Sequence, residues 1–169
     1  MRRAILGIDQ AVGAFSKNTH AHSMIGWAIF LDTGDWHIES WGEVDPDPPQ
    51  YLNVATWLVD AIGTLKAQGY EVHVAIETVY AGPNRDVTLK LAHIQGYIHG
   101  IVISMQAEYS EVLPSESLRA LTGISSRMNR EDRKRAMVAS AEKVLGETPS
   151  DHIADAVGIA QACLNRLTR

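Results

Sequence analysis

Blocks of apolar and polar positions divide the chain into short runs and longer periodic segments. Short apolar runs or strict alternation predict five strands, at residues 4–8, 24–31, 36–42, 72–76 and 109–113. Apolar residues at helical spacing predict four helices, at residues 51–68, 86–105, 130–145 and from 148 or 149 to 167. The pattern predicts no helix in residues 115–129, which end in a glycine-containing loop. Three meandering strands followed by alternating helices and strands predict an α/β fold, with a five-stranded mixed sheet flanked by helices.

Length and composition predict one globular domain over residues 1–169. The 46% apolar content is enough for a sizeable core in a chain of 169 residues. No apolar run approaches the roughly 20 residues of a membrane helix. The five-residue run "AILGI" after Met1-Arg2-Arg3 is too short for a signal-peptide core. Cys163 is the only cysteine, which excludes an internal disulfide and suits a reducing compartment. We therefore expect a cytoplasmic protein without membrane association.

The charge is unevenly distributed along the chain. The formal net charge is −5, which by itself argues mildly against a nucleic-acid partner. Residues 119–135, however, contain six basic and two acidic side chains, so this segment carries +4 and the remainder −9. Such a basic segment is either a footprint for phosphate groups or an ordinary solvated helix face.

Two acidic residues directly follow purely apolar strands. Asp9 stands in "LGIDQ" and Glu77 in "VAIETVY". A single acidic residue after a strand is usually a turn or cap residue. If the two strands are neighbours in the sheet, however, both carboxylates emerge side by side at its carboxyl edge, where open α/β sheets bind ligands. A cation would then relieve their repulsion.

The stretch "TPSDHIADAV" near the end of the chain holds further candidates. Thr148 is a predicted N-cap with Pro149 at the first helical position, and Asp151 is then explained by a capping box. His152 and Asp155 are three residues apart, so they share a face of the predicted helix. They are candidates for a metal-ligand pair. The alternative is a His–Asp hydrogen bond within a satisfied core.

Three stretches together resemble a known family. "LGID", "AIETVYAGPNRDVTLKLAHIQG" and "HIADAVGIAQA" are similar to motifs of the RuvC-type Holliday-junction resolvases, in the family's order and over nearly the whole chain. The middle motif is the most specific, because it combines Glu77, Tyr80 and Asn84 with a helix containing "LKLAHIQG". A lone "GID" would be weak, since sugar kinases and actin-like ATPases share it. The chain departs from the family where "GIDQAVGAFSKNTHAHS" replaces a compact "GIDPG" turn, which leaves substrate contacts there in doubt.

The resemblance implies a ribonuclease H-like fold and a metal-dependent endodeoxyribonuclease that resolves four-way DNA junctions. The implied metal ligands are Asp9, Glu77, His152 and Asp155. Asp151 is an alternative to His152 in that set. Two Mg²⁺ or Mn²⁺ ions per active site are expected, because carboxylate oxygens suit Mg²⁺ and an imidazole ligand tilts the preference toward Mn²⁺.

The resemblance also implies contacts with branched DNA and a second protein chain. Tyr80 matches the family's aromatic wedge, although packing over its own loop would also explain it. Candidates for binding the phosphate backbone are Arg119, Arg127, Arg130, Arg133, Lys134 and Arg135. Lys134 or a neighbouring arginine is expected to stabilise charge on the phosphate during attack. Family members are homodimers, and the helix at residues 86–105, with Ala92, Gly96 and Gly100 at four-residue spacing, is the candidate interface. That spacing could equally serve packing within one chain. Branch-migration motors partner some family members, but the sequence identifies no docking surface for one.

Three alternatives compete with a junction resolvase. One is a related nuclease for other branched or flap DNA, or for RNA–DNA hybrids. Another is an ATP site of the actin-like or sugar-kinase type, for which 169 residues leave little room for a second lobe. The third is a non-catalytic binder of branched DNA, which the full set of ligand candidates argues against.

Overall fold

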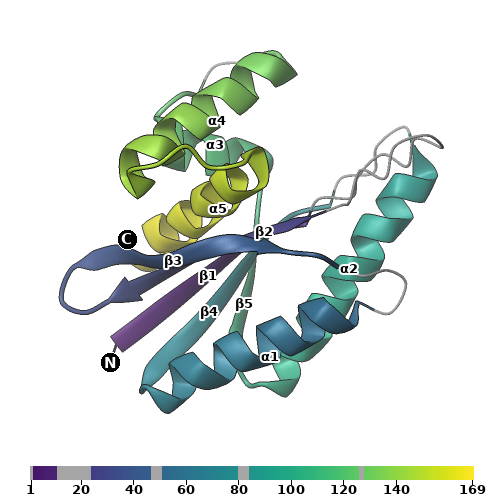
Figure 1. Ribbon diagram of the computed structural model, residues 1–169, viewed down its shortest axis with the longest axis vertical. Coiled ribbons are helices and arrows are strands. Elements are labelled where there is room, and N and C mark those ends of the chain that lie inside the picture. The colour runs from purple at the N-terminus through teal and green to yellow at the C-terminus, as the bar shows by residue number, and fades with distance from the viewer. Residues whose placement is uncertain (1, 11–23, 47–50, 80–83, 126–127) are drawn as a thin grey trace.

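A five-stranded mixed sheet lies at the centre of the structure (Figure 1). The computed structural model describes residues 2–10, 24–46, 51–79, 84–125 and 128–169. The strands are β1 (Arg2–Gln10), β2 (Ile25–Asp32), β3 (Trp36–Val44), β4 (Tyr70–Glu77) and β5 (Glu108–Val112). They lie in the order β3-β2-β1-β4-β5. β1, β2 and β3 pair antiparallel, whereas β4 runs parallel to both β1 and β5. The predicted mixed sheet is therefore present.

Helices cover both faces of this sheet. One face carries α1 (Leu52–Ala67) and α2 (Arg85–Ser104), and the other carries α5 (Asp151–Leu167) (Figure 1). α3 (Pro114–Thr122) and α4 (Arg130–Leu145) pack on α5 rather than on the sheet. Alternation along β1 divides the core, because Leu6 and Ile8 pack beneath α1 and α2 while Ile5 packs beneath α5.

The structure adds a helix, α3, where the sequence pattern predicted none. Its segment "PSESLRALT" has few apolar residues, so hydrophobic periodicity does not reveal it. The signals it carries are at its ends. Pro114 occupies the first helical position, the Glu116 carboxylate accepts a hydrogen bond from the Leu113 backbone N–H, and Gly123 ends the helix at φ 74°.

The last helix begins later than the sequence indicated. Ser150, not Thr148, is the N-cap of α5, and its hydroxyl accepts a hydrogen bond from the backbone N–H of Ile153. The Thr148 hydroxyl instead donates to the Glu142 carboxylate over 2.7 Å. Asp151 is therefore the first residue of α5 rather than the third, and the predicted capping-box role for it is wrong.

Two glycines let α5 lie unusually close to the sheet. A Cβ atom added at Gly7 on β1 would lie 2.3 Å from the carbonyl oxygen of Ala156. One added at Gly26 on β2 would lie 2.2 Å from the carbonyl oxygen of His152. Both distances are far below van der Waals contact with backbone atoms that cannot move aside. The seating of the first turns of α5 on β1 and β2 therefore requires glycine at both positions.

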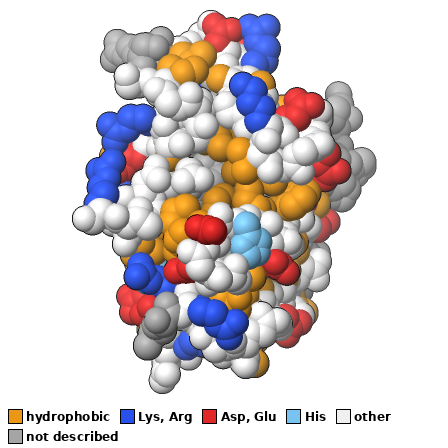
Figure 2. Space-filling view, turned by 90° about the vertical axis from the view of Figure 1, so that its left-hand side faces the viewer, with side chains coloured by type: hydrophobic (Ala, Val, Ile, Leu, Met, Phe, Trp, Pro, Cys, Tyr) orange, Lys and Arg blue, Asp and Glu red, His pale blue; other side chains and the backbone are white. Residues whose placement is uncertain are grey.

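Charged side chains are scattered on the side of the molecule that carries both chain ends. Figure 2 shows basic side chains adjoining at one edge of this side, and elsewhere basic and acidic side chains mixed between apolar areas. None of the described helices is long and apolar enough to cross a membrane.

We expect Gly26→Ala to destabilise the protein by roughly 1–3 kcal/mol, because the added methyl group must displace the first turn of α5. Urea unfolding would measure the change. Gly63→Ala is the matched control, since a Cβ there meets its nearest atom at an ordinary 3.9 Å within helix α1. That control should stabilise by up to about 1 kcal/mol. Unchanged stability of the Gly26 variant would refute the close seating.

Candidate active site

Asp9 and Glu77 leave adjacent parallel strands at the same edge of the sheet. The β1–β4 ladder ends with the pair Ile8 and Ile76, so Asp9 and Glu77 are the next residues on the two strands. Both isoleucines point into the core beneath α1 and α2. Strand alternation therefore turns the two carboxylates toward the opposite face, which α5 covers. From the sequence, we assumed that the strands before Asp9 and Glu77 are neighbours, and β1 and β4 are neighbours in the sheet.

The first turn of α5 brings two more side chains to these carboxylates. The Nδ1 atom of His152 lies 3.0 Å from Oδ2 of Asp9, and the two groups form a hydrogen bond. The Asp155 carboxylate is mostly buried and interacts electrostatically with both Asp9 and Glu77. Four residues predicted as ligands thus come together from β1, β4 and α5. The His–Asp hydrogen bond, which the sequence left as an alternative to metal binding, is formed in this state.

Burial and mutual repulsion shift the proton affinities of the carboxyl groups. Burial, with added repulsion from Asp9 and Asp155, raises the pKa of Glu77 to about 7. Burial and the charge of Asp9 likewise raise the pKa of Asp155 to about 7. Burial also raises the pKa of Asp9. The hydrogen bond to Asp9 raises the pKa of His152. Concentrated negative charge of this kind, with perturbed pKa values, is typical of a functional site.

Basic side chains from α4 partly balance this charge. Nη2 of Arg133 lies 3.5 Å from Oε1 of Glu77, with about a third of each side chain exposed. Lys134 forms an ion pair with Asp151. That pair lowers the pKa of the Asp151 carboxyl. The charge of Asp151 also acts on Asp9 and Asp155, so Asp151 stays an alternative to His152 in the ligand set.

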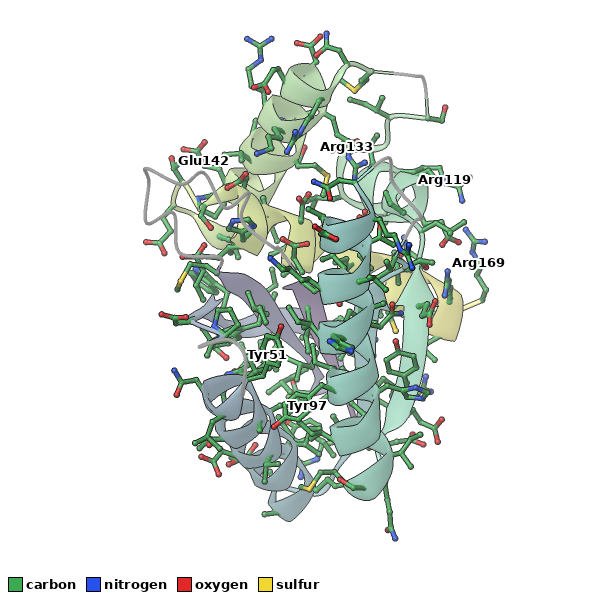
Figure 3. The ribbon with its side chains drawn as sticks, turned by 90° about the vertical axis from the view of Figure 1, so that its right-hand side faces the viewer. Tyr51, Tyr97, Arg119, Arg133, Glu142 and Arg169 are labelled. Atoms are coloured by element: carbon green, nitrogen blue, oxygen red, sulfur yellow. The ribbon has the colours of Figure 1, made fainter. Side chains whose placement is uncertain are left out.

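The remaining DNA-binding candidates do not gather at the carboxylates. Arg135 pairs with Asp132 on the exposed side of α4, and Arg130 is exposed at the start of that helix. Arg119 lines a hollow of about 260 Å³ with Arg166 and other residues of the last turns of α5, whereas His152 belongs to its first turn. Figure 3 shows Arg133 near the upper end of α2 and Arg119 at the side of the molecule. Tyr80 and Arg127 lie outside the described residues.

Gln10 is a residue at this edge that sequence reasoning missed. Its side chain is 5% exposed, and its Nε2 donates a hydrogen bond of 2.9 Å to the backbone carbonyl of Glu77. The bond continues the connection between β1 and β4 by one step beyond the last ladder pair. The Oε1 atom is buried without a hydrogen-bond partner among the described residues. The available signal was that a glutamine, not a turn residue, continues a fully buried strand.

The donor set suits a divalent cation, although the side chains do not yet close around one point. The buried carboxylate of Asp9, the partly buried carboxylates of Glu77 and Asp155, and the imidazole of His152 offer oxygen ligands and one nitrogen. Within the described ranges, no three carboxylate, histidine or cysteine side chains already converge at ligand distances. The hydrogen bond of His152 and the contact of Arg133 occupy two of the carboxylates in this state. The chemistry of these side chains thus fits a divalent cation, while a histidine and an arginine contact two of the carboxylates.

Comparison with known proteins identifies the fold and then the family. The structure superposes on Thermus thermophilus RuvC in complex with a Holliday junction substrate with a TM-score of 0.69 and 16% identity, covering 98% of this chain and 95% of that one. For the yeast mitochondrial Holliday junction resolvase the TM-score is 0.52 at 12% identity, covering 94% and 76%. These likenesses confirm the ribonuclease H-like fold predicted from the motifs.

The sequence comparisons define the family itself. The family model for crossover junction endodeoxyribonuclease RuvC matches residues 50–163, more than half of the chain. A crossover junction endodeoxyribonuclease RuvC from Chlorobium phaeobacteroides is 25% identical over 169 residues, covering 96% of this chain and 82% of that protein. The chain therefore belongs to the RuvC family of crossover junction endodeoxyribonucleases. It is a nuclease of a metal-dependent family, as its motifs predicted.

The raised pKa values predict that stability in EDTA falls as pH rises from about 5 to 8. A carboxyl whose folded-state pKa is about 7, against an ordinary 4.5, contributes stability that is complete below pH 4.5 and lost as pH rises through 7. The raised pKa of His152 acts in the same direction. Urea unfolding at pH 5.5 and pH 8 should show a loss of roughly 1–3 kcal/mol.

The control for this measurement is Glu77→Gln, which removes one of the titrating groups. Its unfolding free energy should vary less with pH than that of the parent protein. A parent whose stability is flat or rises over this range, or a variant with an undiminished pH dependence, would contradict the assigned proton affinities.

Proposed function

We propose that this chain resolves four-way DNA junctions by hydrolysing phosphodiester bonds at the cluster formed by Asp9, Glu77, His152 and Asp155. The observation that carries the proposal is the convergence of a buried and two partly buried carboxylates from β1, β4 and α5 in a chain of the RuvC family. The fold match to a RuvC protein in complex with a Holliday junction supports the substrate class.

The cluster binds and orients two divalent cations, Mg²⁺ or Mn²⁺. Asp9, Glu77 and Asp155 supply the oxygen ligands that Mg²⁺ prefers, and the imidazole of His152 increases the relative affinity for Mn²⁺. Cations held by these residues would supply a hydroxide at neutral pH and neutralise charge on the phosphate. Little backbone movement is needed to bring the carboxylates to the cations, because the ends of β1 and β4 and the first turns of α5 already hold them near one another.

The basic side chains of α4 position the DNA. Arg133 lies beside Glu77, and Lys134 is held by Asp151 next to the first turn of α5, so both can reach a phosphate placed over the carboxylates. Their charges hold the phosphate against the negative cluster and stabilise charge that develops during attack. Arg130 and Arg135, exposed on the same helix, extend this contact along the backbone.

Two chains act together through the outer side of α2. Gly96 and Gly100 have no atom within 4 Å of an added Cβ in the described structure, so packing within one chain does not explain them. Exposed apolar side chains lie on the same helix, with Leu89 53% and Ile103 60% exposed. Such a surface suits close approach of a second helix. A homodimer places two active sites on one junction, which allows paired cuts.

Glu77→Gln should abolish junction cleavage while leaving junction binding intact. The change keeps the shape of the side chain but removes a ligand charge, and a loss of at least about 100-fold is expected because even outer-shell changes cost 10–100-fold. The measurement is a gel assay of a labelled four-way junction with Mg²⁺ or Mn²⁺, beside duplex, flap and RNA–DNA hybrid substrates. Glu71→Gln, at the other end of β4, is the matched control and should cut normally. Undiminished cutting by the Glu77 variant would sink the assignment.

Gly96→Leu should convert the dimer to a monomer without unfolding it. The leucine meets open space in the single chain but would separate two closely packed helices. Analytical ultracentrifugation would report the mass, and urea unfolding would confirm the intact fold. A dimeric parent protein with an equally dimeric variant would place the interface elsewhere.

A further inference from the structure

Arg133 lies where its charge reaches every carboxylate of the active site. It belongs to the first turns of α4, and its Nη2 atom is 3.5 Å from Oε1 of Glu77. Burial raises the pKa of Asp9, Glu77 and Asp155, and the guanidinium charge of Arg133 opposes that rise in all three. The contact distance and the electrostatic effects thus agree that Arg133 lies beside the carboxylate cluster.

The neighbouring basic residues have other partners. Lys134 is paired with Asp151, and Arg135 with Asp132 on its own helix. Among the described basic residues of α4, Arg133 is therefore the one that forms an ion pair with a proposed metal ligand. Its contact with Glu77 is long, at 3.5 Å, and about one third of its side chain is exposed, so the ion pair is weak enough for a competing charge to break.

A divalent cation and this guanidinium compete for Glu77. Both require the same carboxylate oxygens, and two positive charges at one carboxylate repel each other at close range. A cation that binds Glu77 displaces the arginine. The released guanidinium stays tethered beside the site, where its planar fork of donors matches a phosphate group.

We propose that Arg133 couples cation binding to DNA binding, by neutralising Glu77 while no cation is bound and moving to a DNA phosphate when cations enter. This inference rests on the proposed nuclease function and deepens it. The coupling is reciprocal. If cation binding raises the affinity for DNA through Arg133, DNA binding must raise the affinity for cations by the same factor. The chain would then hold junctions weakly until the site is loaded for hydrolysis.

The test compares Arg133→Gln with the parent protein in two binding measurements that do not depend on cleavage. Calorimetric titration with Ca²⁺ in the absence of DNA reports cation affinity. Fluorescence anisotropy of a labelled four-way junction, in Ca²⁺ and in EDTA, reports DNA affinity, with the junction checked on a gel for integrity. Arg135→Gln is the matched control for the Ca²⁺ titration, because it removes the same charge from the same helix but breaks an ion pair with Asp132 rather than with Glu77.

Three results are expected if Arg133 moves between the two partners. Without DNA, the Arg133 variant should bind Ca²⁺ about fivefold more tightly than the parent, because the competitor is gone. Its DNA affinity in Ca²⁺ should fall by about the same factor. Its DNA affinity in EDTA should change little, so that the gain in DNA affinity on adding Ca²⁺ becomes smaller than in the parent. The Arg135 variant should keep the parent's Ca²⁺ affinity.

Two other outcomes would overturn the proposal. Weaker Ca²⁺ binding by the Arg133 variant would mean that the arginine positions Glu77 for the cation. An equal loss of DNA affinity in Ca²⁺ and in EDTA would mean that the arginine binds phosphate at all times. Either result together with normal junction cutting by the parent protein would reject the coupling alone. Absence of both cutting and Ca²⁺ binding in the parent would instead reject the proposed function.

Discussion

The close seating of α5 on the sheet is the constraint on which the site depends. Gly7 and Gly26 remove the two side chains that would otherwise separate the helix from β1 and β2. This close seating of α5 lets His152 reach Asp9. It also brings Asp155 near enough to interact electrostatically with the carboxylates at the ends of the strands. Dense packing makes this arrangement stiff, since protein interiors tolerate little extra volume. The arrangement of the charged side chains thus depends on two glycines, Gly7 and Gly26, that carry no functional group themselves.

Bringing these carboxylates together opposes folding, and the surrounding charges offset part of that cost. Burial and repulsion favour the protonated forms of Glu77 and Asp155 near neutral pH. His152 and Arg133 each contact one carboxylate of the cluster and reduce its excess charge. These contacts offset part of the repulsion among the carboxylates, and the raised pKa values make stability fall toward alkaline pH.

Local patterns predicted much of this molecule, and long-range packing determined what they missed. The apolar runs located all five strands, and the acidic residues after two of them were Asp9 and Glu77. The three-residue spacing of His152 and Asp155 predicted that they share one face of the last helix. Helix α3 escaped because its stability comes from packing on α5 and from its caps rather than from apolar periodicity. The contact of Arg133 with Glu77 joins residues 56 positions apart, which no local pattern encodes.

β4 lies between the two proposed sites, the carboxylate cluster and the α2 surface, which are on opposite faces of the sheet. The α2 surface proposed to bind a second chain lies on one face, and the helices that carry His152, Asp155 and Arg133 lie on the other. Glu77 ends β4, and α2 begins eight residues later at Arg85. The side chain of Gln10 ties the backbone of Glu77 to the end of β1, at the point where the chain leaves the sheet. The position of the Glu77 carboxylate thus depends on a contact with β1 as well as on the β1–β4 ladder.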